Sequence, residues 1–294
     1  MECGKPNCIG QKSGSSYTDR QAVKQPDRKR IIIMITYDIH MHTRLSTCSG
    51  DPNSTVPNFI KLLKGTSIKT IGISDHMWDS DVPGASEWYA PQNFDHICEV
   101  HQQIPEDFDY QGMRVIFGCE AEFDMHGTLG ITREHAQQLD FVICPHSHTH
   151  MRDFVMPAEY LASYEKHGQF MVESFLKLIN HPDIDCITSI AHPFDPCGDG
   201  AHVEEILSCI TDAQFEDCFR SARDAGVGIE LNAASFRNAF TRYPDIATSQ
   251  YNRMYRIAKA CGCRFTYGSD SHSPSRYFMF DWMDKACDAF GLKD

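Results

Sequence analysis

Short runs of apolar residues recur along the chain, separated by longer segments of helical periodicity. Seven of these runs are rich in β-branched residues and are short enough to be buried strands. In chain order they read RIIIMITYDI, IKTIGIS, MRVIFGC, DFVICP, DCITSIA, VGIELN and CRFTYGS. The pattern therefore predicts seven strands.

Helix signals lie between these runs. Residues 54–64 and 250–260 have the spacing and end signals of helices, residues 159–180 suit one long amphipathic helix, and a further helix ends at Gly226. Strand and helix alternate, which is typical of a parallel sheet covered by helices. Polar residues follow nearly every strand, so a closed α/β barrel is favoured over an open doubly wound sheet.

The barrel is predicted to be a single domain over residues 31–294. No tandem repeat, low-complexity block or Gly/Ser-rich linker divides this part. Residues 1–30 contain seven basic residues and few apolar ones, which predicts a flexible tail rather than a secretory signal. Met34 stands where a shorter reading frame would begin, so part of the tail is a candidate artefact of start-site choice.

Composition and charge argue against several classes of partner. The net charge is −13, a poor match for duplex nucleic acid, which binds mainly through Lys and Arg. The apolar run at residues 31–35 is far shorter than the roughly 20 residues of a membrane span, so a soluble protein is predicted. Thirteen cysteines without a secretory signal predict free thiols in a reducing cytoplasm. The oligomeric state stays open.

The first strand ends in YDIHMHT, which places His40 and His42 two residues apart. Side chains at i and i+2 of a strand point to the same face, so both imidazoles leave the strand together. Two such groups can hold one metal ion, but a structural or solvent-facing role is more common for this motif alone, so the other strand ends decide between the two.

The other strands also end in groups that bind metals. Eight of the fifteen histidines lie at these ends, together with several carboxylates. Around nine such ligands exceed what one tetrahedral ion needs, so more than one ion is predicted. Glu120, central in the strand order, is the candidate carboxylate that bridges two ions. The strand-end groups are Asp75 and His76, Glu120 and Glu122, His146, His148 and His150, His192, Glu230, Asn232 and Arg237, and Asp270 and His272.

The motifs DIHMH, ISDH, GCE, AHPF and GSDSH, in this order at strand ends, resemble those of the polymerase and histidinol phosphatase (PHP) family of metal-dependent phosphoesterases. The resemblance covers residues 37–272. It implies a distorted TIM-like (β/α)7 barrel that holds two or three divalent ions of zinc, manganese or iron.

The resemblance also implies a set of ligands. Asp270 and His272 are expected to be catalytic as well as metal-binding. The implied ligands are His40, His42 and Asp270 for the first ion, Glu120 as the bridge to the second, His148 and His192 for the second, and His76 and His272 for the third.

Two positions in this set are open. Any of His146, His148 and His150 could be the ligand after the fourth strand, and His148 is chosen for its distance from the strand. Cys48 occupies a position where the family often has a further histidine. A thiolate binds zinc, but a cysteine there could equally leave the third site weak or empty.

The segment ELNAASFR is similar to a family stretch whose arginine grips the substrate phosphate, which implies that Arg237 binds substrate. We therefore expect hydrolysis of a small phosphomonoester, with histidinol phosphate as one candidate, by metal-activated water. Asp38, Asp75 and Glu122 are expected to orient the histidines or to lie near the pocket.

Three other functions compete with this hypothesis. A nuclease or nucleotide phosphodiesterase would use the same metals, although the acidic body disfavours long substrates. Amide hydrolysis on a related barrel typically needs a bridging lysine, and no strand-end lysine stands in place of Glu120. A metal-binding module without catalysis is the third, supported only by Cys48.

Overall fold

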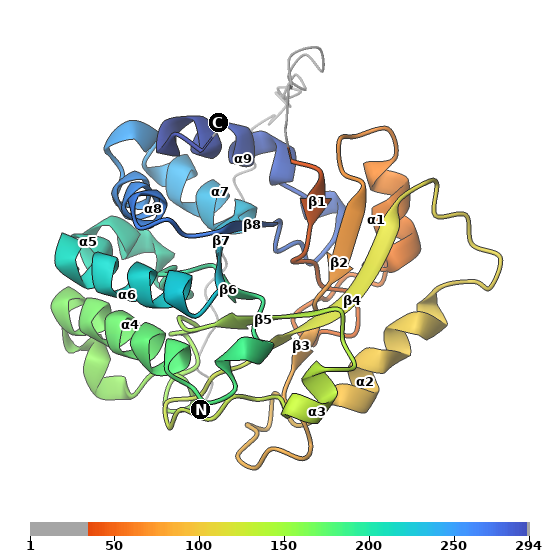
Figure 1. The fold of residues 1–294 in the computed structure, drawn as a ribbon. Coiled ribbons are helices and arrows are strands. Elements are labelled where there is room, and N and C mark those ends of the chain that lie inside the picture. The colour runs from red at the N-terminus through yellow and green to blue at the C-terminus, as the bar shows by residue number, and fades with distance from the viewer. Residues whose placement is uncertain (1–34, 293–294) are drawn as a thin grey trace, which may run out of the picture. The chain divides into compact units, whose positions relative to one another are not determined.

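The computed structural model describes residues 35–292. The predicted tail, Met34 and most of the apolar run before Tyr37 lie outside the described residues. Within residues 35–292, all strand pairings of the sheet are parallel and helices surround the ring of strands (Figure 1). The predicted α/β barrel is therefore confirmed.

The strands follow one another around the barrel in nearly the order of the sequence. The seven predicted strands are all present, in the order β1-β2-β4-β5-β6-β7-β8, and an eighth, β3, pairs with β4. The sequence did not predict β3, because a strand of two residues is too short to form an apolar run. The strands are β1 Tyr37–Asp38, β2 Thr70–Ile73, β3 His76–Met77, β4 Arg114–Ala121, β5 Phe141–Pro145, β6 Ser189–Ala191, β7 Gly228–Asn232 and β8 Phe265–Gly268.

The ring closes between the segments that follow β1 and β8. The backbone N–H of Ile39 donates to the carbonyl of Tyr267 at 3.0 Å, and that of Asp270 donates to His40 at 2.8 Å. Met41 also forms a parallel bridge with Ser271. The first and last strands are thus joined through the same residues that carry the predicted ligands.

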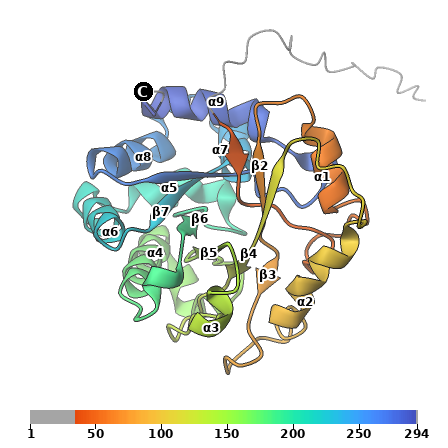
Figure 2. The same cartoon turned by 45° about the vertical axis from the view of Figure 1, so that its right-hand side comes forward.

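Helices cover the outside of the ring (Figure 2). Of the four predicted helices, three are confirmed at nearly the predicted positions, as α1, α6 and α8. The bounds are α1 Val56–Leu63, α2 Phe94–Cys98, α3 Arg133–Ala136, α4 Tyr164–Ile179, α5 Val203–Ser208, α6 Asp212–Asp224, α7 Ala233–Arg242, α8 Gln250–Ala260 and α9 Met279–Phe290.

The prediction of one helix over residues 159–180 was wrong at its beginning. A 3-10 helix spans Ala158–Ala162, and α4 begins only at Tyr164. Ser163 between them is extended, with φ −161°, and its side chain accepts the N–H of Lys166. A serine cap of this kind satisfies an otherwise unpaired donor and starts a new helix.

The interior of the barrel is apolar in one part and polar at the carboxyl ends of the strands. A small apolar cluster, formed by Ile39, Phe141, Ile143 and Ala191, lies within the ring. Phe141 packs directly against Gly118, where an added Cβ would clash with it. The carboxyl ends of the strands instead present buried histidines and carboxylates. None of the helices in residues 35–292 combines the length and apolar character that a membrane span requires.

Candidate metal centre

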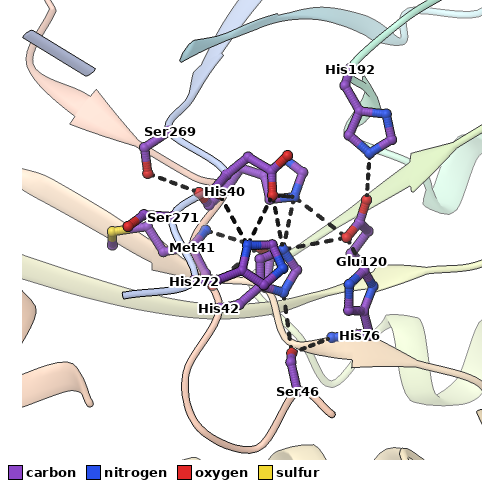
Figure 3. Close-up of polar contacts among 12 residues, drawn as sticks. His40, Met41, His42, Ser46, His76, Glu120, His192, Ser269, Ser271 and His272 are labelled. Atoms are coloured by element: carbon purple, nitrogen blue, oxygen red, sulfur yellow. Dashed lines mark hydrogen bonds and ion pairs between the residues drawn. The ribbon is translucent and has the colours of Figure 1, made fainter. Parts of the chain in front are cut away.

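All eight predicted ligands lie together at the carboxyl ends of the strands. Figure 3 shows Glu120 between His192 and His76, with His40, His42 and His272 beside it. The pairing of β3 with β4 sets His76 directly beside Glu120. Among the described residues, the closed ring is what brings these distant segments to one place.

Two of the site residues adopt unusual backbone conformations. His192 has φ 27° and Asp270 has φ 54°, values that L-residues adopt rarely and that turn the chain sharply at the strand ends. Hydrogen bonds hold both turns. The N–H of His192 donates to Glu230 Oε2 at 2.6 Å, and that of Asp270 donates to the carbonyl of His40.

One side of Glu120 has the geometry of a four-ligand site. Its Oε2 lies 3.4 Å from Nε2 of both His40 and His42, and those two nitrogens are 3.1 Å apart. Asp270 Oδ1 lies 3.6 and 3.5 Å from the same two nitrogens. Zinc–nitrogen bonds of 2.0–2.1 Å give a tetrahedron with edges of about 3.3 to 3.4 Å, so these spacings suit one ion.

The other oxygen of Glu120 faces a second pair of imidazoles. Its Oε1 lies 3.0 Å from Nε2 of His192 and 3.7 Å from Nε2 of His148. Each carboxylate oxygen of Glu120 thus faces a different pair of imidazole nitrogens. This is the arrangement of a carboxylate that bridges two ions.

A third group of donors lies beside the first. Ligand nitrogens of His42, His76 and His272 lie within 4.8 Å of one another, and the ring of His272 stacks on that of His42 at 4.2 Å. Cys48 is an exposed residue of the loop after β1. Partial desolvation opposes ionisation of its thiol, but the charges of His76 and His272 lower its pKa to about 6.

Two buried polar atoms of the centre lack hydrogen bonds within residues 35–292. They are His76 Nδ1 and Glu120 Oε2, which lie 3.0 Å apart without hydrogen-bond geometry. Leaving such atoms unpaired in a protein interior is costly. A cation beside them would satisfy both atoms, so the donor set fits divalent metals.

Part of the centre already has the charges that metal binding requires, whereas His40 and His76 must each lose a proton as an ion binds, because burial opposes their charging but neighbouring carboxylates raise their pKa well above the ordinary value. Burial opposes ionisation of Glu120 and Asp270, but neighbouring histidines hold the pKa of each carboxyl well below its usual range. Burial likewise lowers the pKa of His42 well below its ordinary value, helped by His272 and His76. The carboxylates are therefore ionised and His42 is neutral, which are the states that coordinate ions.

The four histidines that face Glu120 through Nε2 share one further feature. In each, Nε2 points toward the centre while Nδ1 contacts another side chain, which fixes the ring orientation. The contacts from Nδ1 are His40 to Glu230 Oε1 at 2.7 Å, His42 to Ser46 Oγ at 3.2 Å, His148 to Glu122 Oε2 at 2.6 Å and His192 to Cys197 Sγ at 3.8 Å.

Sequence reasoning named Glu122 and Glu230 as strand-end groups but missed Ser46 and Cys197. Both of these lie in loops, where only the folded conformation brings them beside a histidine. Ser46 in turn donates to Asp75 Oδ1 at 2.7 Å. No motif in the sequence identifies either residue.

Asp38 and Asp75 accept hydrogen bonds mainly from backbone N–H groups in the loops that carry the candidate ligands. Asp38 Oδ1 accepts the N–H groups of His40 and Ser269, both at 3.0 Å. Asp75 accepts the N–H and the hydroxyl of Thr43 at 2.7 and 2.8 Å. These bonds hold the segments after β1 and β8 in place.

The three histidines after β5 occupy different environments. His146 Nε2 accepts the N–H of Phe194 at 3.0 Å, and burial lowers the pKa of His146 to about 3. His150 is exposed. His148 directs Nε2 toward Glu120, which is the geometry expected of a ligand.

A cavity of about 660 Å³ opens directly beside the centre. His192 and Asp270 line it at the strand ends, one face of α7 lines it with Arg237, and the loop after β6 lines it with Cys197. Arg237 is exposed, and its guanidinium carbon lies 4.2 Å above the ring of Phe278. Among the described residues it has no carboxylate partner, so it remains available to an anion in the cavity.

No family model matches the chain, and no curated protein matches it by sequence. Solved structures do match. The histidinol phosphate phosphatase HisK of Lactococcus lactis, in complex with zinc, L-histidinol and phosphate, has a TM-score of 0.55 at 16% identity, covering 87% of this chain and 93% of that one.

A second similar structure is that of a protein assigned as the histidinol phosphatase HisK of Listeria monocytogenes. Its TM-score is 0.52 at 14% identity, and the match covers 82% of this chain and 97% of that chain. The protein therefore shares its fold with these histidinol phosphatases over most of both lengths.

Proposed function

We propose that this protein is a metal-dependent phosphatase of the PHP type that hydrolyses a small phosphomonoester. The observation that carries the proposal is the position of Glu120. Its two carboxylate oxygens face separate groups of buried histidines. A bridging carboxylate between two ions is the arrangement that in-line displacement at phosphorus uses. The shared fold with histidinol phosphatases supports the same reaction.

The proposed ligands divide around Glu120. His40, His42 and Asp270 would hold one ion with Oε2, and His148 and His192 would hold another with Oε1. When bound, such ions polarise the phosphate and lower the pKa of a water molecule. Zinc is the favoured metal, since it is present in the Lactococcus lactis structure, while manganese and iron accept the same donors.

Asp270 and His272 are proposed as the members of the centre that face the substrate. Their side chains are 20% and 31% exposed, whereas those of His40, His42 and Glu120 are 0 to 1% exposed. Asn232, which caps α7, donates to Asp270 Oδ2 at 3.4 Å and so holds that carboxylate at the edge of the cavity.

The cavity suits a small substrate. Its volume of about 660 Å³ lies within the usual range of ligand pockets, roughly 300 to 1,000 Å³. Arg237 on the wall of the cavity offers a planar fork of hydrogen-bond donors, which suits a substrate phosphate held beside Asp270 and His192. Histidinol phosphate is the first substrate to test, because the Lactococcus lactis enzyme binds L-histidinol and phosphate.

The cysteines support a reducing location such as the cytoplasm. All eleven cysteines among the described residues are free thiols. Several of them, including Cys119 and Cys144, are buried in the core. Free thiols in this number are typical of proteins that function under reducing conditions.

The test is a combined metal and activity measurement on the full chain. Protein purified without chelator should contain at least two divalent ions and should release phosphate from histidinol phosphate or p-nitrophenyl phosphate. Treatment with chelator should abolish this activity, and added zinc or manganese should restore it. Full activity in metal-free protein, or cleavage of oligonucleotides without any phosphomonoesterase activity, would overturn the proposal.

A further inference from the structure

A second guanidinium lies on the cavity wall in addition to that of Arg237. Helix α7 supplies both, since Arg237 and Arg242 line the same cavity of about 660 Å³. Both side chains are exposed, and within residues 35–292 neither forms an ion pair with a carboxylate. By contrast, Arg133, Arg220 and Arg253 each do. The cavity therefore has two cationic groups that are available to a ligand.

Helix α7 runs away from the metal centre and so orders the two arginines along the cavity. It begins after Asn232, whose side chain donates to Asp270 Oδ2 at 3.4 Å, and it ends at Arg242. A helix rises about 1.5 Å per residue, so Arg237 stands about 7.5 Å beyond Asn232 along the axis, and Arg242 about 7.5 Å further. Arg242 is thus placed to meet a part of the substrate that is distant from the metals.

The carboxylates of the cavity wall lie at its inner end. Of the described residues that line the cavity, only Asp195 and Asp270 carry a carboxylate. Asp270 is a proposed metal ligand. Asp195 is tied to His192, to whose carbonyl its N–H donates at 3.1 Å, and burial raises the pKa of Asp195. Neither group belongs to the end of the cavity that Arg242 lines.

The outer end of the cavity is otherwise uncharged. Thr241 and Ala201 line it, and the hydroxyl of Tyr243 donates to the carbonyl of Ala201 at 3.1 Å, which joins the end of α7 to the loop after β6. The same hydroxyl contacts Glu205 at 3.4 Å, but Glu205 does not line the cavity. Arg242 therefore sets the charge that a ligand meets at this end.

We propose that the outer end of the cavity binds a second anionic group of the substrate, a phosphate or a carboxylate, through Arg242. The inference rests on the proposed phosphatase function and deepens it, because it names the substrate class as a phosphomonoester with an anion at its far end. A guanidinium presents a planar fork of donors that matches either anion. The ammonium group of histidinol phosphate would gain no such contact from Arg242.

Arg242 also lies in the last turn of α7, where a cation stabilises a helix through its interaction with the macrodipole. A purely structural role of this kind would not distinguish one ligand from another. The test therefore compares ligands that differ only in the second anion.

Alkane phosphonates are suitable probes, because their phosphorus–carbon bond is not hydrolysed. Metal-loaded full-length protein is given linear α,ω-bisphosphonates of increasing length, ω-phosphonocarboxylates, and monophosphonates of the same lengths. Inhibition of p-nitrophenyl phosphate hydrolysis measures their binding, and calorimetry measures it without catalysis. At the length that spans both arginines, the second anion should strengthen binding about 10-fold or more, as a hydrogen bond to a charged group does. The two kinds of second anion show whether phosphate or carboxylate fits better.

Variants assign this gain to a residue. Arg242→Gln should bring the ratio of the two binding constants close to 1, and Arg242→Lys should retain part of the gain. Arg256→Gln on α8 removes the same charge from an exposed position outside the cavity and should keep the wild-type ratio. The inference is overturned if wild-type protein binds both classes equally at every length, if the gain survives Arg242→Gln, or if Arg256→Gln loses it as well.

Failure of the phosphatase proposal has a different signature. A metal-dependent phosphatase with no preference for a second anion would overturn the role of Arg242 alone. Protein that shows the preference by calorimetry but hydrolyses no phosphomonoester would support the anion site and overturn the proposed reaction. Protein that binds neither metal nor any phosphonate would overturn both.

Discussion

The Nδ1 atom of His40 lies 2.7 Å from Oε1 of Glu230, a contact between residues 190 positions apart in the chain. It links the segment after β1 to β7 over Gly268 at the end of β8. The second oxygen of Glu230 accepts the N–H of His192 at 2.6 Å. One carboxylate therefore positions a histidine on each side of Glu120.

Glu230→Gln should weaken metal binding. The neutral amide is a poorer partner for the His40 imidazole, and removal of such a partner typically costs about 10- to 100-fold in metal affinity. Titration of metal-free protein with zinc against a competing chelator measures the change. Glu134→Gln, an exposed carboxylate on α3, is the control and should bind zinc as the wild type does. Equal affinity in both variants would contradict the role of Glu230.

Glu120→Gln should affect two ions at once. An amide has one oxygen and one nitrogen in place of two anionic oxygens, so it cannot serve both groups of histidines. We expect the number of ions retained after gel filtration to fall by at least one and phosphatase activity to be lost. Elemental analysis of the purified variant gives the count, and an unchanged count would show that Glu120 does not bridge.

Arg237→Ala should impair the use of substrate without removing metal. A hydrogen bond to a charged group contributes roughly 1.5 to 3 kcal/mol, which corresponds to a fall of about 10- to 100-fold in kcat/KM for a phosphomonoester. Arg237→Lys should recover only part of this loss, because an ammonium lacks the planar fork. Arg256→Ala on α8 serves as the exposed control. A loss of bound metal in Arg237→Ala would argue instead for a structural role.

Removal of metal should destabilise the fold. Ions that bind only the folded chain stabilise it by mass action, by about 2.7 kcal/mol when free metal is 100 times its Kd. Chelator should therefore lower the melting temperature, and added zinc should restore it. The same additions should have a smaller effect on Glu120→Gln. If chelator leaves the melting temperature of the wild type unchanged, the proposed metal centre is contradicted.

Acid should weaken the fold partly through His167, which lies on α4 away from the centre. Burial lowers the pKa of this imidazole, although Asp199 opposes the shift. As the pH falls below about 6.5, the unfolded chain binds this proton more readily than the folded chain, so the free energy of unfolding decreases. His167→Gln should flatten this decrease between about pH 7 and 5 in urea unfolding experiments. His101→Gln, an exposed control, should keep the wild-type slope.

The seven predicted strands could be recognised because each lies in an apolar run that is at least partly buried. The short strand β3 could not, since two residues carry no periodicity and its pairing depends on β4. Helix α7 was also missed. It begins at Ala233 directly after β7, with Asn232 as its cap, so strand and helix signals overlap in one stretch of sequence.

The candidate ligands could be proposed from their places at strand ends, because parallel strands in a closed ring direct those ends to one region. The partners of the ligands could not. Ser46 and Cys197 belong to loops whose path depends on the whole fold, and the choice among the three histidines after β5 depends on which ring turns into the core. His146 does so, and its Nε2 accepts the N–H of Phe194.

The seam that joins the segments after β1 and β8 has a consequence for biosynthesis. During translation, Asp270 and His272 are made more than 220 residues after His40 and His42. A nascent polypeptide therefore has an incomplete ring and an incomplete set of ligands until the segment after β8 is made. The proposed ions can therefore be bound in full only after the seam between these segments has closed.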